Sequence, residues 1–393
     1  MKRVNKLLSV LAAGVLFAGA LAGCGGSKEA KQDTIKIGGC LEMTGGSASF
    51  GISSKNGIEL ALKNVNQKGV LGGKKVELVV ADNKSEASEA LNAMQKLISQ
   101  DKVVAVIGPN LSSACIASSA INNAGKVMAI SPLGTNPDVT VDPKTGKTRE
   151  YNFRACFIDP FQGTVMANYA FKNGARKVAI VQEVSNDYSV GLAKFFKEAF
   201  IKLTNDPDCI IDVANYQTGD KDFTAILTNL KAKNPDAVFA PGNFTESALL
   251  IKQAHQLGIN VPFMGGDTWE TQEFIDVGGK DVEGAVMSTA FDREKASTQE
   301  AQKFLKAYTD EYKAEPSALS AMAYDAYLIA IDAMKRANSV EPQKIRDAIA
   351  TTKDLEAVTG KTTLDKNGDA EKAAVIKVVK EGKFKYLDFV DAK

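Results

Sequence analysis

Two polar segments that follow strand-like runs carry residue types suited to binding a charged small molecule. The first, residues 108–113 (G-P-N-L-S-S), comes after the strand-like run 103–107 and opens a helical pattern. Backbone N–H groups at a helix start are unpaired and point outward, and a serine there adds its hydroxyl. Ser112 is therefore suited to bind a carboxylate. The alternative is that Ser112 or Ser113 only caps the helix.

The second segment, residues 131–137 (S-P-L-G-T-N-P), follows the strand-like run 127–130 and is bracketed by prolines. Proline fixes φ, so we expect this loop to be rigid. A rigid loop holds its backbone carbonyls and the Thr135 hydroxyl in fixed directions, as a polar binding site requires. Taken alone, the segment is also compatible with an ordinary turn.

The N-terminus has the pattern of an export signal. Lys2, Arg3 and Lys6 precede an apolar or small-residue run over 7–22, which is too short for a comfortable membrane span. The run ends in L-A-G-C at 21–24, which resembles the lipobox of bacterial lipoproteins. The resemblance implies cleavage before Cys24 and lipid attached to its thiol. The alternative is ordinary cleavage with a free thiol.

These features predict where the protein is located. We expect a signal peptide over 1–23 and a flexible polar tether over 24–34. The folded part would then be held at the outer face of the bacterial cytoplasmic membrane. No other stretch of the sequence is long and apolar enough to cross a bilayer, so we expect membrane contact only through the lipid.

Composition argues against several classes of protein. Without the three basic residues of the signal, the 48 Lys and Arg fall to 45 against 47 Asp and Glu, so neither nucleic acid nor an anionic membrane is an expected partner. The single histidine, His255, argues against a His-based metal site and a Ser-His-Asp mechanism. Cys40, Cys115, Cys156 and Cys209 show no CxxC spacing, so their pairing stays open. We expect no metal and no cofactor.

Strand-like and helical runs alternate along the rest of the chain and predict a parallel α/β fold. The first strand-like runs are 35–39, 76–81, 103–107 and 127–130, with helical runs at 56–66, 87–98 and 114–123. After residue 153 strand-like runs follow at 177–182, 209–213, 237–240, 261–264 and 284–289, with helical runs at 165–171, 191–203, 223–231 and 246–257. A long helix is expected over 318–337, and a hairpin over 375–379 and 384–389.

The restart of the pattern predicts two doubly wound parallel-sheet lobes with a ligand cleft between them. We expect the N-terminal lobe to comprise 35–155 and 291–357, and the C-terminal lobe 156–290 and 358–393. Three crossing segments, near 154–157, 289–292 and 357–359, would form a hinge. The carboxyl ends of the strands face such a cleft, so the two polar segments fall at its edge.

With its elements in this order, the chain resembles the Leu/Ile/Val-binding family of periplasmic amino-acid receptors, the substrate-binding lipoproteins of ABC transporters. Five segments carry the resemblance: 108–113, 131–137, G-G-S-A-S-F-G at 45–51, N-D-Y-S-V-G-L at 186–192 and F-M-G-G-D at 263–267. The resemblance runs from residue 35 to the C-terminus. It implies the type I periplasmic-binding fold, in which two lobes close over the ligand.

The resemblance also implies roles for residues of the first lobe. Ser112 would bind the ligand α-carboxylate. The Leu133 carbonyl and the Thr135 hydroxyl would bind the ammonium, with Gly134 between them and the Thr135 N–H on the carboxylate. Phe50 would line the pocket for the ligand side chain.

In the second lobe, the resemblance implies that Tyr188 covers the ligand and that Asp267 neutralises its ammonium. The family usually has Glu at this position, so Asp267 has a shorter reach. Asn243 stands where the branched-chain binders have an aromatic residue. Four further residues are expected near the cleft: Glu42, Gln162, Phe244 and Trp269. A polar ligand side chain could use Asn243, Gln162 or Glu42, so the ligand class stays open.

We therefore predict a non-enzymatic receptor of an ABC importer, which captures a free branched-chain or other hydrophobic amino acid and delivers it to the permease and ATPase complex. The alternatives are a ligand sensor, or a binder of a small amide or polar amino acid, with the same fold. A hydrolase built from Ser112, His255 and Asp267 is not favoured, because His255 falls on a solvated helix face. We expect a monomer that closes by hinge motion after the ligand docks on the first lobe.

Overall fold

The computed structural model describes residues 34–391. The expected signal peptide, the expected lipidation site Cys24 and the expected tether up to residue 33 lie outside the described residues. Within 34–391, no helix combines the length and the apolar character that a bilayer span needs. Strands and helices alternate as expected, which confirms the α/β class.

Five parallel strands form the first sheet, in the order β2-β1-β3-β4-β5. They are β1 (Ile35–Leu41), β2 (Val76–Asp82), β3 (Ala105–Ile107), β4 (Ala129–Ser131) and β5 (Asn152–Arg154). Short apolar runs suit these positions because helices cover both faces of a parallel sheet, and β3, β4 and β5 are buried along their whole length. The sequence pattern did not predict β5.

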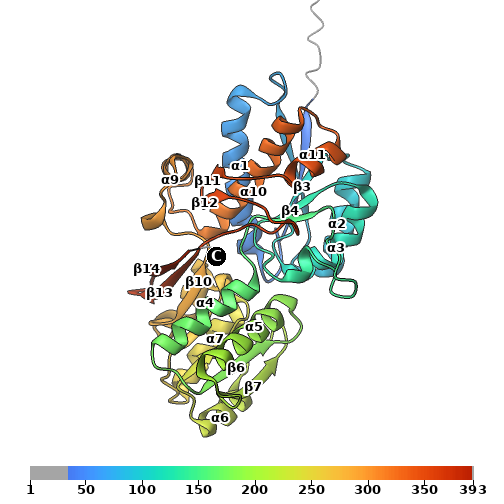
Figure 1. Ribbon diagram of the computed structural model, residues 1–393. Helices are drawn as coiled ribbons and strands as arrows, with labels where there is room; N and C mark the ends of the chain where they lie inside the picture. The colour runs from blue at the N-terminus through green and yellow to red at the C-terminus, as the bar shows by residue number, and fades with distance from the viewer. Residues whose placement is uncertain (1–33, 392–393) are drawn as a thin grey trace, which may run out of the picture. The chain divides into compact units, whose positions relative to one another are not determined.

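Helices from distant parts of the chain cover this sheet. They are α1 (Ala48–Lys68), α2 (Ala87–Ser99), α3 (Ser112–Gly125), the 3-10 turn η1 (Pro137–Val139), α9 (Gln299–Tyr312), α10 (Ala318–Ala337) and α11 (Pro342–Ile349). In Figure 1 the orange α10 lies beside the blue α1, although residues 69–317 separate the two helices in the sequence. A Cβ at Gly57 would lie 2.1 Å from the Ser320 carbonyl oxygen, so only glycine allows the two helices to approach so closely.

The second sheet repeats the strand order of the first and adds a hairpin. Its order is β7-β6-β8-β9-β10-β13-β14, and only the pairs made by β13 are antiparallel. The strands are β6 (Val178–Glu183), β7 (Ile210–Tyr216), β8 (Ala237–Phe239), β9 (Phe263–Gly265), β10 (Val286–Thr289), β13 (Ala374–Lys380) and β14 (Lys383–Val390). The two doubly wound units and the C-terminal hairpin are thus confirmed.

The helices of the second lobe flank this sheet, with α4 and α5 packed together and shown in green in Figure 1. The α-helices are α4 (Asp159–Lys172), α5 (Asp187–Thr204), α6 (Thr224–Lys233), α7 (Phe244–Gln256) and α8 (Gln272–Gly278). Short 3-10 turns in this lobe are η2 (Asp267–Trp269) and η3 (Gly279–Val282), and η4 (Arg293–Lys295) follows β10 in the segment expected to belong to the first lobe. A separate two-stranded sheet, β11 (Leu355–Ala357) with β12 (Gly360–Thr362), was not predicted.

Buried ion pairs lie where the chain passes between the lobes. Lys377 Nζ of β13 is 2.8 Å from Glu270 Oε1 and 3.1 Å from Asp292 Oδ2, and the three side chains are each 7% exposed. Desolvation lowers the pKa of Lys377, but the two carboxylates outweigh it and raise the pKa overall. A second buried pair joins Lys372 Nζ to Asp325 Oδ2 at 3.5 Å. The expected hinge region is therefore held by charges that water does not screen.

Packing also bears on the lobe boundaries, which stay a prediction. Val358, Leu364 and Ala370 belong to the core of the first lobe. The next strand, β13, pairs with β10 in the second sheet. This packing favours a crossing after Ala370 rather than at residue 358.

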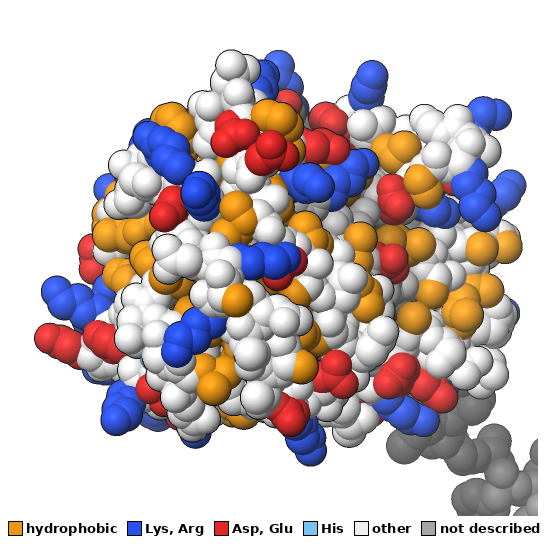
Figure 2. Space-filling view, turned by 90° about the horizontal axis from the view of Figure 1, so that it is seen from below, with side chains coloured by type: hydrophobic (Ala, Val, Ile, Leu, Met, Phe, Trp, Pro, Cys, Tyr) orange, Lys and Arg blue, Asp and Glu red, His pale blue; other side chains and the backbone are white. Residues whose placement is uncertain are grey.

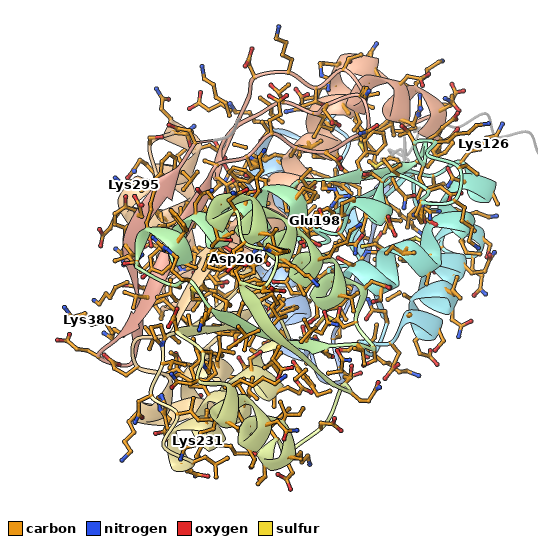
Figure 3. All side chains as sticks on the ribbon, turned by 60° about the horizontal axis from the view of Figure 1, so that its bottom comes forward. Lys126, Glu198, Asp206, Lys231, Lys295 and Lys380 are labelled. Carbon is orange, nitrogen blue, oxygen red and sulfur yellow. The ribbon has the colours of Figure 1, made fainter. Side chains whose placement is uncertain are left out.

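The outer surface carries charges of both signs. On the face seen in Figure 2, basic and acidic side chains are interspersed and apolar ones are scattered between them. Lys126, Glu198 and Lys231 are exposed and are labelled on the stick view of Figure 3. On this face the charges are mixed rather than gathered by sign, in keeping with the near balance of acidic and basic residues in the sequence.

Candidate ligand-binding site

A pocket opens at the carboxyl ends of the strands and takes its lining from both lobes. It encloses about 320 Å³, including space open to solvent. From the first lobe it is lined by Phe50, Asn110, Leu111, Ser112, Leu133 and Leu319, and from the second by Asn186, Tyr188, Asn243, Asp267 and Thr268. Six of the eight predicted ligand-binding residues line this pocket; Gly134 and Thr135 do not, although they adjoin Leu133 in the chain.

Ser112 is placed by a buried brace beneath the start of α3. Glu42 accepts hydrogen bonds from the Asn110 N–H at 3.1 Å and the Asn110 side-chain amide at 2.6 Å. Burial raises the pKa of Glu42, while these donors oppose the rise. Gly108 has φ +99°, and a Cβ there would lie 2.2 Å from the Cys40 carbonyl oxygen, so the turn requires glycine. Glu42 thus holds the turn before Ser112 rather than lining the pocket.

The proline-bracketed loop is held from below by Arg154, which is fully buried. Its guanidinium donates to the Gly134 carbonyl at 2.6 Å and the Asn136 carbonyl at 2.9 Å. The Thr135 hydroxyl is buried and has no hydrogen-bond partner within residues 34–391. The Asn136 N–H donates to Ser112 Oγ at 3.3 Å, which ties the loop to the helix start. Hydrogen bonds from a buried arginine thus hold two carbonyls of the loop in place beneath the pocket.

One carboxylate oxygen of Asp267 accepts hydrogen bonds from neighbouring side chains, and the other does not. Its Oδ1 accepts from the Tyr188 hydroxyl and from the Gln162 amide, both at 2.9 Å. Among the described residues no hydrogen bond reaches its Oδ2, and Asp267 lines the pocket. Burial raises the pKa of Asp267 to about 6, against the effect of the two donors. Gln162 and Tyr188 thus orient the carboxylate that a ligand cation would meet.

A second buried carboxyl, Asp159 at the first turn of α4, was not predicted. Its N–H donates to the Thr135 carbonyl at 2.9 Å, whereas neither of its side-chain oxygens has a hydrogen-bond partner in the described structure. Burial raises the pKa of Asp159 to about 8; the Thr135 hydroxyl and Arg154 oppose the rise, and Asp267 adds to it. The site therefore places two buried carboxyls close to the Thr135 loop.

The rest of the pocket is mainly apolar. Phe50 of α1 and Phe244 of α7 are in contact across the lobes, with ring centroids 5.4 Å apart. Leu111, Leu133 and Leu319 complete the wall. Trp269 does not line the pocket, because it is fully buried against Phe274 with ring centroids 4.8 Å apart.

Sequence reasoning missed several lining residues. Leu111 and Asn186 lie inside the motifs at 108–113 and 186–192, and Thr268 directly follows Asp267, so considering every residue of the motifs and the next one along would have found them. Leu319 comes from α10, far from every motif, and no local signal marks it. His255 pairs with Asp281 at 3.5 Å and does not line the pocket. Nothing in residues 34–391 gathers three or more metal-binding side chains.

The two lobes also touch directly beside the pocket. The Asn136 side-chain amide donates to the Asp187 carbonyl at 2.7 Å, and the Asp187 N–H donates to Ser113 Oγ at 3.2 Å. Phe50 and Leu319 of the first lobe pack in an apolar cluster with residues of the second. These contacts describe a closed cleft.

A two-lobed α/β fold with a closed interlobe pocket agrees with comparison to known proteins. The family model described as periplasmic binding protein matches residues 34–383. The chain belongs to this family. A Leu/Ile/Val-binding protein, BraC3, from Rhizobium johnstonii is 32% identical to it over 343 residues, covering 85% of this chain and 88% of that protein.

Solved structures of the same family are also similar to this chain. The leucine-binding protein LivK from Thermotoga maritima is 38% identical, with a TM-score of 0.85, covering 91% of this chain and 99% of that one. The branched-chain amino acid transporter substrate-binding protein LivJ from Streptococcus pneumoniae, solved with isoleucine, is 34% identical with a TM-score of 0.83, over 91% and 99% of the two chains. The fold predicted from the sequence is confirmed.

Proposed function

We propose that this protein is the extracytoplasmic solute receptor of an ABC importer, which captures a free branched-chain or other hydrophobic amino acid and delivers it to the permease. One observation carries the proposal. The interlobe pocket has the Ser112 helix start and the free Oδ2 of Asp267 among its polar groups, and an apolar wall around Phe50. The similarity to Leu/Ile/Val-binding proteins supports the same ligand class.

A zwitterion needs partners for both charges when it leaves water. The N–H groups at the start of α3 and the Ser112 hydroxyl suit its carboxylate. Asp267 Oδ2, the Leu133 carbonyl and the Thr135 hydroxyl suit its ammonium, and the bond to a carboxylate is the strongest of these. The leucine and phenylalanine side chains then remove an aliphatic side chain from water.

The binding test is calorimetry and thermal unfolding of residues 25–393 with each of the twenty amino acids, after unfolding and refolding to remove any bound ligand. We expect one or a few aliphatic L-amino acids to bind, and a ligand at 100 times its Kd to add about 2.7 kcal/mol to the free energy of unfolding. The matching D-amino acid is the control, because it has the same ammonium and carboxylate groups but the side chain and the hydrogen on Cα exchange places. No binding by any amino acid would refute the proposal.

Lipid attachment at Cys24 belongs to the same proposal. A tethered receptor stays close to its permease, so each capture is followed by an encounter at high effective concentration. A labelled fatty acid should enter the wild-type protein in cells and should not enter a Cys24→Ala variant. Equal labelling of both would remove the anchor from the proposal while leaving ligand capture intact.

We propose that the receptor delivers the amino acid that it captures to the permease, rather than sensing it or acting on it as an enzyme. We also propose that it acts as a monomer. Uptake of the bound amino acid should stop when the gene for this chain is deleted and return when it is restored. A Ser112→Ala, Asp267→Ala double variant should fail to restore uptake. Normal uptake in the deletion strain would favour a sensor.

A further inference from the structure

Asn243 stands at the start of α7 but does not use its side chain as a helix cap. Asparagine is among the best N-capping residues, so a hydrogen bond from a backbone N–H of α7 to this side chain would be expected, but it does not form. Its backbone N–H donates instead to Glu183 Oε2 at 3.2 Å. The side chain lines the pocket, and its Oδ1 is buried without a hydrogen-bond partner in the part of the chain that the structure describes.

The neighbouring donors are already engaged. The Asn186 side-chain amide donates to Glu183 Oε2 at 3.3 Å, and the Thr268 hydroxyl donates to the Gly242 carbonyl at 2.8 Å. Behind Gly242 lie the Tyr216 and Ser247 hydroxyls, which are buried without a hydrogen-bond partner in residues 34–391 and do not line the pocket. None of these groups donates to Asn243 Oδ1 within the described residues, so a donor on the molecule that occupies the pocket can pair with it.

The other lining residues near the ligand side chain restrict what that occupant is. Phe50, Leu111 and Leu319 offer no polar contact, so the ligand side chain is largely apolar. Apart from Asp267, which is assigned to the ligand ammonium, no charged side chain lines the pocket, so a charged ligand side chain would be buried without a matching charge. One hydroxyl on a short aliphatic side chain meets both conditions. A hydroxyl both donates and accepts, so it suits either orientation of the Asn243 amide.

We propose that Asn243 is a specificity-determining residue that binds a hydroxyl on the ligand side chain, so that the pocket takes threonine in preference to its isostere valine. This inference rests on the proposed capture of a free amino acid, and it changes the expected ligand side chain from a purely hydrophobic one to a short aliphatic one that carries a hydroxyl. Threonine and valine have the same shape, so the apolar wall treats them alike and only the polar contact separates them. A site that hydrogen-bonds a hydroxyl discriminates against the analogue lacking it, because its own polar group is left unpaired.

The test compares the affinities of threonine and valine by calorimetry on ligand-stripped protein. We expect wild type to bind threonine about tenfold or more tightly than valine. Asn243→Leu keeps the size of the side chain and removes its hydrogen bonding, so valine should then bind at least as tightly as threonine. Asn243→Ala, with a smaller side chain, should show the same loss of preference if Asn243→Leu unfolds. The matched control is Ser247→Ala, which removes a buried hydroxyl that does not line the pocket and should keep the wild-type ratio.

The outcomes separate the two proposals. If valine, leucine or isoleucine binds wild type and the threonine-to-valine ratio is the same in the Asn243 variants, the inference is overturned and the proposed function stands. If threonine binds tightly and only the Asn243 variants lose the preference, the inference is supported. If no amino acid binds wild type, the proposed function falls and the inference falls with it.

Discussion

At the scale of single residues, two buried carboxyls mark the site, and neither forms an ion pair within residues 34–391. Asp267 and Asp159 are both buried, and burial raises the pKa of the first to about 6 and of the second to about 8. Arg154 lies nearby, but Gly134, Asn136 and Asp369 occupy its guanidinium. A ligand ammonium would favour the ionised form of Asp267, which is the one of the two carboxyls that lines the pocket.

Removing Asp267 should leave a bound ammonium with neutral acceptors and the more distant Asp159. We expect Asp267→Ala to raise Kd at least tenfold, or about 1.4 kcal/mol, with the fold unchanged. Calorimetry against the best natural ligand measures the effect. The control is Asp276→Ala, which removes an aspartate that does not line the pocket. Unchanged affinity in Asp267→Ala would mean that the ammonium is bound elsewhere.

The raised pKa of Asp267 also predicts a pH dependence. Above pH 6 the carboxylate is ionised and attracts the ammonium; below pH 6 it gains a proton and this attraction is lost. We therefore expect Kd to rise by about tenfold for each pH unit below the transition, since one proton competes with the ligand. The transition should persist in Asp159→Asn and vanish in Asp267→Asn. A flat profile in wild type between pH 7 and about 4.5 would contradict this assignment.

At the scale of elements, strand ends and helix starts present the polar groups, and buried charges brace the passage between the lobes. β13 contributes Lys377 to that brace, with Glu270 from the turn after β9 and Asp292 from the segment after β10. A buried lysine with two carboxylates is stable only while all three are present. We infer that this trio fixes the second sheet against the crossing segments.

Lys377→Met should therefore destabilise the protein, because it leaves two buried carboxylates without a cation. We expect a loss of about 3 kcal/mol or more in the free energy of unfolding. Lys380→Met is a matched control on the same strand, since Lys380 is exposed and labelled in Figure 3; its effect should stay within about 0.5 kcal/mol. Urea unfolding of both variants decides the matter. Equal midpoints would show that the trio contributes little.

At the scale of the whole molecule, the pocket exists only because the two lobes are together. Phe50 meets Phe244 across the cleft, and Asn136 reaches the Asp187 backbone. Each lobe alone has only part of the lining, so the open form would expose these apolar side chains to water. Ligand binding and closure are then one equilibrium, because a ligand that contacts both lobes favours the form in which both contacts are made.

Small-angle scattering should show a smaller radius of gyration when a tightly bound amino acid is added to ligand-stripped protein. The D-amino acid control should leave the radius unchanged. Asp267→Ala at the same free ligand concentration should show a smaller change, because the second lobe loses its charged contact. A high-affinity ligand that caused no compaction would refute hinge closure as the mechanism.

Much of this architecture follows from local pattern. The strand-helix alternation, the duplication of a doubly wound unit and the hairpin at the C-terminus all follow from apolar periodicity, because that periodicity reflects the geometry of neighbouring residues. The motifs at 108–113 and 131–137 fall at strand ends in the structure, as expected. Ser112, Leu133, Tyr188 and Asp267 reach the pocket because each follows such an end within a few residues.

Only the tertiary structure decided which side chains meet. Leu319 enters the pocket from α10, and Glu42 turns away from it to hold Asn110. Asp159 and Lys377 are buried beside charges from remote segments, and no short stretch of sequence encodes such partners. The sequence by itself determined the elements and the edge of the sheets where polar groups gather. The packing of the two lobes determined the pocket, because burial and charge pairing depend on residues far apart in the chain.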